Sequence, residues 1–151
     1  MKTLLALTAL AALSPLAAAA QNCEGSPTGA KLEVLVEGVN ASKGEMTGSI
    51  YPGDPTQFLI KNGALKVWSV PAIAPVTRMC IWLKNGPGTY AFAVYHDADS
   101  SGVFKHSLFG TFDGFGFSNN PRTWFSAPKY DRVKFVAKAG LTVLHVRLRY
   151  P

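Results

Sequence analysis

Apolar and polar residues alternate with a period of two along much of the chain from residue 30 onward. The alternation is clearest over residues 32–36 and 144–150, where apolar side chains share one face and polar or charged side chains the other. A period of two is typical of β-strands with one buried face. Weaker versions of the pattern predict further extended segments over these ranges: 46–51, 66–70, 76–83, 89–96 and 132–137.

The segment 89–96 differs from the others because it is apolar on both faces, which predicts a central strand. Turn signals separate the strands, and one of them spans residues 85–88. Another lies at Gly140, where we expect a hairpin that joins the last two strands. About seven short strands without an amphipathic helix predict an all-β protein. We expect an antiparallel β-sandwich, with an open barrel as the alternative.

The first twenty residues have the pattern of a secretory signal peptide. Lys2 is followed by an apolar run over 3–13 and by small residues at Ala18, Ala19 and Ala20. We expect residues 1–20 to be removed and residues 21–151 to form a single β-sandwich domain in the periplasm or outside the cell. No later segment is long and apolar enough to predict a transmembrane span.

The sequence contains two cysteines, Cys23 and Cys80. Disulfides persist in the oxidising environment that an exported protein meets, so the pair is a candidate disulfide between the N-terminus and a central strand. Two separate thiols, with Cys80 buried, are the alternative. Their wide spacing, without a CxxC motif, argues against zinc binding or thiol redox chemistry.

The chain is basic, with fifteen Lys and Arg against nine Asp and Glu and a formal net charge of +6. Many of the basic residues lie near the C-terminus: Lys129, Arg132, Lys134, Lys138, Arg147 and Arg149. Such a surplus can attract lipid headgroups or an anionic envelope polymer or carbohydrate, or it can simply form a solvated face. Nucleic-acid binding is not predicted, because neither a basic helix nor an aromatic RNA-binding signature is present.

An acidic loop follows the segment 89–96 and fits the first half of a calcium-binding loop. A calcium ion here would be bound by oxygens of four residues: Asp97, Asp99, Ser101 and Val103. The second half of the pattern is missing, since Lys105 and Leu108 occupy the later ligand positions. The alternative is that these side chains hydrogen-bond the backbone of the loop as Asx-turns.

Histidines flank this loop. His96 precedes Asp97, and His106 lies further along, so a transition-metal site is a second hypothesis. However, His96 and Asp97 are neighbours in a strand and should point to opposite faces. The sequence contains no recognised set of catalytic residues, but His96, Asp97 and Asp99 are the groups that an enzyme acting on envelope carbohydrate or peptide would use.

The segment 114–120 alternates glycine with phenylalanine and ends in two asparagines. It predicts a recognition loop in which aromatic rings stack on sugars while Asn119 and Asn120, with His96, hydrogen-bond the ligand. The alternative, which we favour for the rings, is that Phe115 and Phe117 plug the end of the sandwich.

Several of these residues together resemble a known family. The matching residues are Leu83, Gly86–Ala91, Val94–Asp97, Gly102, Gly110 and Gly116–Asn120. They resemble the bacterial exported family called Domain of Unknown Function 2141, over most of the chain after the signal peptide. The family loop has the form His-Asp-x-Asn-x-Asn-Gly with an Asp three residues later; here Asp99 and Ser101 replace the asparagines and Lys105 replaces that Asp. The resemblance implies an exported β-sandwich of transthyretin-like or immunoglobulin-like type.

We therefore expect a non-enzymatic exported module with a binding or structural role in the bacterial envelope. The first alternative is the envelope-acting enzyme described above, and the second is an adhesion module stabilised by calcium.

Overall fold

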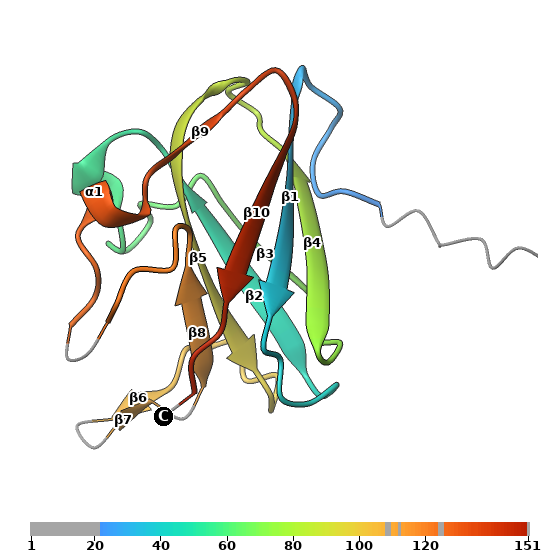
Figure 1. Ribbon diagram of the computed structural model, residues 1–151, viewed down its shortest axis with the longest axis vertical. Coiled ribbons are helices and arrows are strands. Elements are labelled where there is room, and N and C mark those ends of the chain that lie inside the picture. The colour runs from blue at the N-terminus through green and yellow to red at the C-terminus, as the bar shows by residue number, and fades with distance from the viewer. Residues whose placement is uncertain (1–21, 108–109, 112, 124–125, 151) are drawn as a thin grey trace, which may run out of the picture.

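The computed structural model describes residues 22–107, 110–111, 113–123 and 126–150. These residues form a sandwich of two β-sheets (Figure 1). The first sheet has the order β10-β1-β4, with bounds Gly140–Arg147, Ala30–Glu37 and Val76–Trp82. The second has the order β3-β2-β5-β8, with bounds Lys66–Pro71, Glu45–Tyr51, Gly88–Asp97 and Gly114–Phe117, and β9 (Phe135–Ala137) pairs with the start of β5. The predicted all-β sandwich is confirmed.

Four short elements lie outside the two sheets. They are the 3-10 turn η1 (Pro55–Gln57), the single helical turn α1 (Tyr130–Val133), and the strands β6 (His106–Ser107) and β7 (Gly110–Thr111), which pair with each other. Figure 1 shows α1 beside the loop that contains η1, while the β6–β7 hairpin extends beyond the start of β8. The start of the predicted segment 132–137 therefore belongs to a helical turn.

The first sheet contains one parallel pair. Strand β1 runs parallel to β10, with Ala30 opposite Gly140 and Glu37 opposite Arg147, whereas the other pairs of named strands in the described part are antiparallel. The predicted hairpin at Gly140 is wrong, because β9 pairs with β5 while β10 pairs with β1. Gly140, with a φ of 81°, instead lies where the chain passes from one sheet to the other.

The core lies between the sheets and follows the alternation in the sequence. Along β1 every second residue is buried, so that Leu32, Val34 and Val36 have no exposed surface. Strand β5 lies between β2 and β8, as its two apolar faces predict, and places Phe92 against Trp68 with 5.7 Å between ring centroids. Each such side chain contributes about 1.5–3 kcal/mol when it leaves water.

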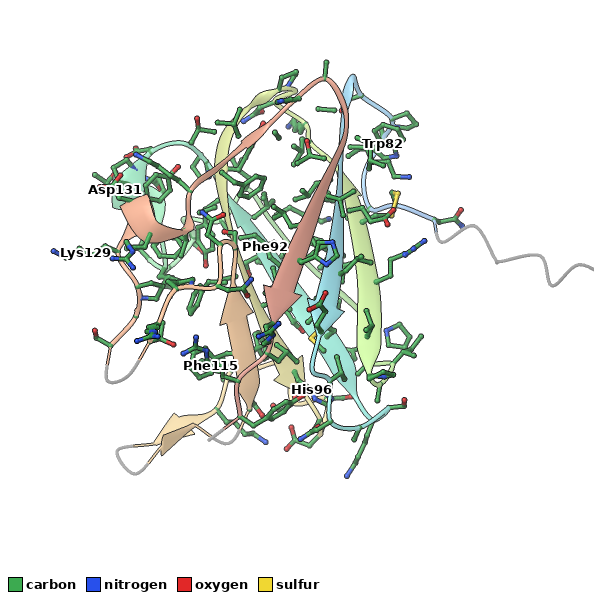
Figure 2. All side chains as sticks on the ribbon, viewed as in Figure 1. Trp82, Phe92, His96, Phe115, Lys129 and Asp131 are labelled. Carbon is green, nitrogen blue, oxygen red and sulfur yellow. A yellow bond between two sulfur atoms is a disulfide. The ribbon has the colours of Figure 1, made fainter. Side chains whose placement is uncertain are left out.

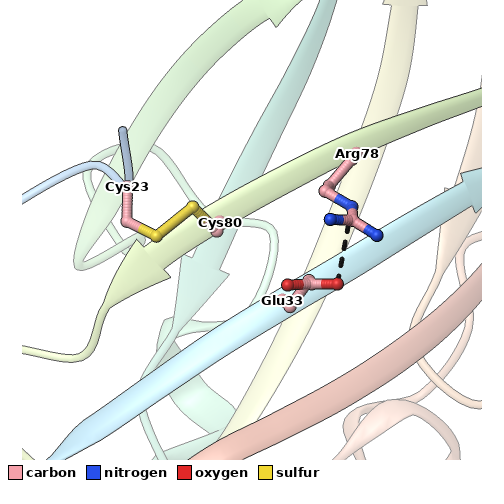
Figure 3. The surroundings of a disulfide bond; sticks show 4 residues. All are labelled: Cys23, Glu33, Arg78 and Cys80. Atoms are coloured by element: carbon pink, nitrogen blue, oxygen red, sulfur yellow. Dashed lines mark ion pairs between the residues drawn. A yellow bond between two sulfur atoms is a disulfide. The ribbon is translucent and has the colours of Figure 1, made fainter. Parts of the chain in front are cut away.

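The N-terminal segment is tied to the edge of β4. Cys23 and Cys80 lie at disulfide-bonding distance, with 4.8 Å between their Cα atoms (Figure 3). The backbone of Glu24 exchanges hydrogen bonds of 3.0 and 2.9 Å with Cys80 and Trp82, and its carboxylate forms a 2.7 Å ion pair with Lys66 on β3. The segment therefore covers the edge of β4 and reaches across to the second sheet. A disulfide closing a loop of this length typically stabilises a fold by about 2–4 kcal/mol.

Two further predictions concern the signal peptide and a membrane span. The predicted signal peptide at residues 1–20 lies outside the described residues. Within the described residues, no helix has the length and apolar character required to cross a membrane.

Candidate functional site

The acidic loop after β5 is organised by the carboxylate of Asp97, the last residue of that strand. Asp97 is fully buried. Its Oδ1 accepts a 2.9 Å hydrogen bond from the N–H of Ser101 and lies 3.2 Å from the Ser101 hydroxyl, while its Oδ2 accepts a 2.6 Å bond from the N–H of Gly102. Both oxygens therefore bind the loop's own backbone, as the Asx-turn alternative predicts.

Lys105 supplies a positive charge to this loop. Its ammonium forms an ion pair with Asp99, and its N–H donates a 2.7 Å hydrogen bond to Oδ2 of the buried Asp113. The hydrogen bond from Lys105 lowers the pKa of Asp99 to about 2, and the same bond raises the pKa of Lys105. The negative charges of Asp113 and Asp97 also raise the pKa of Lys105. A cation of the protein itself therefore balances the carboxylates of the loop.

The four residues predicted to bind calcium thus have partners inside the loop. The Ser101 hydroxyl also lies 3.2 Å from the carbonyl oxygen of Val103. Among the described residues, no three His, Cys, Asp or Glu side chains are grouped so that they could hold a metal ion. A calcium ion would have to compete with these hydrogen bonds and with Lys105, so calcium binding stays a prediction.

His96 lies inside the sandwich at the end of β5 and is 1% exposed (Figure 2). Its Nε2–H donates a 2.7 Å hydrogen bond to the carbonyl of Lys43. In the neutral ring, Nδ1 then accepts from the hydroxyl of Tyr150 at 2.8 Å, and the Tyr150 oxygen accepts from the N–H of Asn40 at 3.2 Å. Burial raises the pKa of Tyr150. As placed, His96 joins a loop to the C-terminal segment and is not presented to an external ligand.

The two asparagines after β8 connect their turn to neighbouring elements. Nδ2 of Asn119 donates to the carbonyl of Lys134 at 2.7 Å. Nδ2 of Asn120 donates to the carbonyl of His145 at 2.9 Å, and its Oδ1 accepts from the N–H of Arg147 at 2.7 Å. The Asn120 amide thus pairs with the edge of β10 as a neighbouring strand would. Both amides that the sequence assigned to a ligand are engaged within the chain.

Strand β8 places its glycines toward the interior and its phenylalanines outside. Gly114 and Gly116 are buried, whereas Phe115 and Phe117 are half-buried. A Cβ atom on Gly116 would lie 2.8 Å from the Val146 side chain, so glycine lets β8 approach β10 closely. The prediction that the two rings plug the end of the sandwich is therefore wrong. Figure 2 shows Phe115 at the side of β8.

The outward rings belong to a continuous row on the outer face of the second sheet. The row, which we call the aromatic track, consists of five half-buried residues: Tyr95, Phe104, Phe115, Phe117 and Phe58. Successive ring centroids along it lie 5.4, 6.1, 6.0 and 6.3 Å apart, within the range of favourable aromatic contacts. At the Phe58 end the track rests on the buried Tyr51 and Tyr130. Burial raises the pKa of Tyr95, Tyr51 and Tyr130.

Hydroxyl groups continue the same face beyond the rings. Tyr95 lies opposite both Phe115 on β8 and Thr47 on β2, and Thr47 lies opposite Ser69 on β3. The hydroxyls of Thr47 and Ser69 are 2.8 Å apart; Thr47 is buried, whereas Ser69 is exposed. Residues opposite one another in a sheet share a face. One row of the outer face therefore runs from aromatic rings to hydroxyl groups.

A shallow cleft lies beside the aromatic track, where β8 meets the end of the chain. It is lined by Phe115, Gly116, Phe117, Asn120, Pro121, Thr123, Arg147 and Arg149 and encloses about 10 Å³, which is room for about one water molecule. Backbone hydrogen bonds between Phe115 and Arg149 join β8 to the segment after β10 at this point. Such a cleft suits a ligand that lies across the surface rather than one that is enclosed.

The site contains few groups suited to catalysis. The Ser118 hydroxyl is buried against the backbone of Phe92 and Val133. In the described residues, one histidine contacts a carboxylate: Nδ1 of His145 lies 2.7 Å from Glu37 on the exposed strand surface of the first sheet, outside the cleft. The side chain of His106 lies outside the described residues.

The sequence pattern singled out the Phe115 and Phe117 segment, but it did not predict that Phe104, Phe58 and the two cleft arginines lie beside it. Phe104 and Phe58 lie in irregular segments, where no periodicity assigns a face. Arg147 and Arg149 were recognised as the polar face of the last strand, and only the pairing of β8 with that segment brings them to the rings.

Comparison with known proteins identifies one family. Residues 34–144 match the family model described as "Uncharacterized protein conserved in bacteria (DUF2141)". The searches of curated proteins and of solved structures found no match. The matched range covers more than two thirds of the chain, from β1 into β10. The chain therefore belongs to the DUF2141 family of bacterial proteins.

Proposed function

We propose that this protein is an exported, non-catalytic β-sandwich module of the bacterial envelope that binds carbohydrate along the aromatic track. The observation that carries the proposal is the continuous row of five half-buried rings on the outer face of the second sheet, with the exposed hydroxyl of Ser69 on the same face. Sugars have apolar C–H faces and hydroxyl edges. Rings with an exposed hydroxyl on the same face offer a matching surface for both.

Export is supported by two independent features. Residues 1–20 have the order of charged, apolar and small residues that secretory signals share. Cys23 and Cys80 lie at disulfide-bonding distance, and disulfides persist mainly in oxidising compartments such as the bacterial periplasm. Both features fit a protein that works outside the cytoplasm.

The shallow site sets the expected strength of binding. A ligand that lies across the surface is only partly desolvated, and ring contacts contribute about 0.5–1.5 kcal/mol each beyond their buried area. We expect dissociation constants between about 1 µM and 1 mM for short oligosaccharides. This range is measurable by calorimetry.

The test is isothermal titration of the mature protein with three glycan probes: peptidoglycan fragments, dextran oligosaccharides and oligogalacturonate. We expect binding of at least one of these probes, weakened about 3- to 10-fold by Phe115→Ala or Phe104→Ala. Val136→Ala, which truncates a side chain that is 64% exposed on β9, is the matched control and should leave the affinity unchanged. Absence of binding to all three probes, or equal binding by the ring variants, would refute the proposal.

A further inference from the structure

Two arginines stand beside the aromatic track with their side chains exposed. Arg147 ends β10, and Arg149 follows two residues later, so both alternate with the buried Val146 and Leu148. Side chains two residues apart in an extended segment point to the same side. Both arginines line the cleft that also contains Phe115. Two guanidinium groups therefore lie along one wall of the site.

These guanidinium groups have no carboxylate partner in the described part of the chain. All nine Asp and Glu residues lie there, and none of them forms an ion pair within 4.0 Å with Arg147 or Arg149. The ion pairs that do form involve other cations, such as Lys66, Lys105 and Lys134. Glu37 lies opposite Arg147 on β1, yet its carboxylate contacts His145 instead, at 2.7 Å. The positive charge at the cleft is consequently left for another partner.

The segment that carries the two arginines is held in place by side-chain and backbone hydrogen bonds. Asn120 forms two hydrogen bonds with β10, one of them accepted from the N–H of Arg147 at 2.7 Å. Arg149 exchanges two backbone hydrogen bonds with Phe115, at 2.9 and 2.8 Å. A fixed backbone lets the arginines bind a ligand without ordering the chain first, which lowers the entropic cost of binding.

We propose that Arg147 and Arg149 bind the carboxylates of an acidic polysaccharide whose sugar rings lie on Phe115 and Phe117. A guanidinium presents paired N–H donors in a planar fork that matches a carboxylate. A uronic-acid polymer has a carboxylate on each sugar ring. Its sugar faces would contact the aromatic rings while its carboxylates pair with the arginines beside them. This inference rests on the proposed function and names the class of carbohydrate.

The shape of the site favours a glycan over a lipid surface. The rings of the aromatic track are half-buried and the arginines flank a concave cleft, so a flat membrane would reach the charges but not the rings. Membrane-surface binding instead needs apolar side chains that project into the lipid. A single extended glycan chain that lies across the cleft can contact both the rings and the arginines.

The test compares oligogalacturonate with its methyl ester, which has the same sugar rings without the negative charges. Calorimetry on the mature, disulfide-intact protein at about 50 mM salt should show the acid form binding at least about tenfold more tightly, because each lost ion pair of this kind weakens binding severalfold. The double variant Arg147→Gln/Arg149→Gln should bind both forms equally, near the affinity of the natural protein for the ester. Phe115→Ala should weaken both forms by the same factor.

The control variant Lys61→Gln/Lys84→Gln removes the same net charge from residues that do not line the cleft. It should keep the preference for the acid form over the methyl ester. If the arginine variant keeps the preference while Phe115→Ala still weakens binding, the arginine inference fails and the proposed function stands. If the natural protein binds neither form nor any other glycan, both fail. Preferential binding of vesicles containing anionic lipid over oligogalacturonate would also overturn the inference.

Discussion

Phe115 on β8 and Arg149 after β10 each donate a backbone hydrogen bond to the carbonyl of the other, at 2.9 and 2.8 Å. This bridge joins the second sheet to the end of the chain that leaves the first. It also places the Phe115 ring and the Arg149 guanidinium on the lining of one cleft. The contact that closes one side of the sandwich is therefore the contact that builds the proposed site.

The closeness of β8 and β10 depends on glycine at position 116. Gly116→Ala would place a Cβ atom 2.8 Å from the Val146 side chain and 2.9 Å from the carbonyl oxygen of Arg147. We expect a loss of about 1–3 kcal/mol in the free energy of unfolding, measured by urea denaturation. Gly29→Ala is the control, because a Cβ atom there meets nothing within 4 Å. Equal stability of the two variants would mean that β8 and β10 are not this close.

The Cys23–Cys80 pair should stabilise the sandwich through the edge of β4. Replacing both cysteines with serine removes the cross-link, and we expect a loss of about 2–4 kcal/mol because the unfolded chain gains freedom. Hydrogen exchange should accelerate most at the amides of Glu24 and Trp82, whose bonds hold the N-terminal segment in place. Unchanged exchange at both amides would show that the segment stays attached without the disulfide.

His96 is expected to act on stability and not on binding. His96→Leu leaves the carbonyl of Lys43 and the hydroxyl of Tyr150 without their buried partner, which should cost about 2–4 kcal/mol of unfolding free energy. Tyr150→Phe keeps the ring and removes the hydroxyl, so a smaller loss of about 1–2 kcal/mol is expected. Glycan affinity of both folded variants should match that of the natural protein. A stable His96 variant that no longer binds glycan would instead assign the histidine to the ligand.

The ion pair between Asp99 and Lys105 predicts a specific response to pH. The pKa of Asp99 is lowered from its ordinary 3.8 to about 2 by the hydrogen bond from Lys105. A lowered carboxyl pKa means that the pair is complete above the unfolded value and is lost as the pH falls through about 2. NMR titration of the Asp99 carboxyl should show this midpoint, and Lys105→Gln should move it back toward 3.8. A midpoint that Lys105→Gln leaves unchanged would remove Lys105 as the cause.

The sequence predicted those features that depend on local pattern. The alternation in β1 identified its buried face, and the doubly apolar β5 was correctly expected to be central. The parallel pairing of β1 with β10 was not predictable, because strand order depends on contacts between distant residues. Gly114–Phe117 shows the same limit, since alternation alone does not say whether the glycines or the rings face the core.

The acidic loop illustrates how the same residues fit two chemistries. The spacing identified Asp97, Asp99 and Ser101 as residues whose oxygens could bind a metal ion. In the folded chain these oxygens do contact groups of the same loop. What the spacing did not reveal is that loop N–H groups bind Asp97 and that Lys105 pairs with Asp99. Local pattern thus located the polar loop, while the partners of its oxygens emerged only from the folded chain.

The central claim is that carbohydrate lies on the aromatic track with its acidic groups at Arg147 and Arg149. The most direct measurement is an amide NMR titration of the mature protein with oligogalacturonate. We predict that the largest shift changes fall on Phe104, Phe115, Phe117, Arg147 and Arg149. Changes confined to the acidic Asp97–Gly102 part of the loop, or no changes at millimolar oligogalacturonate, would contradict the claim.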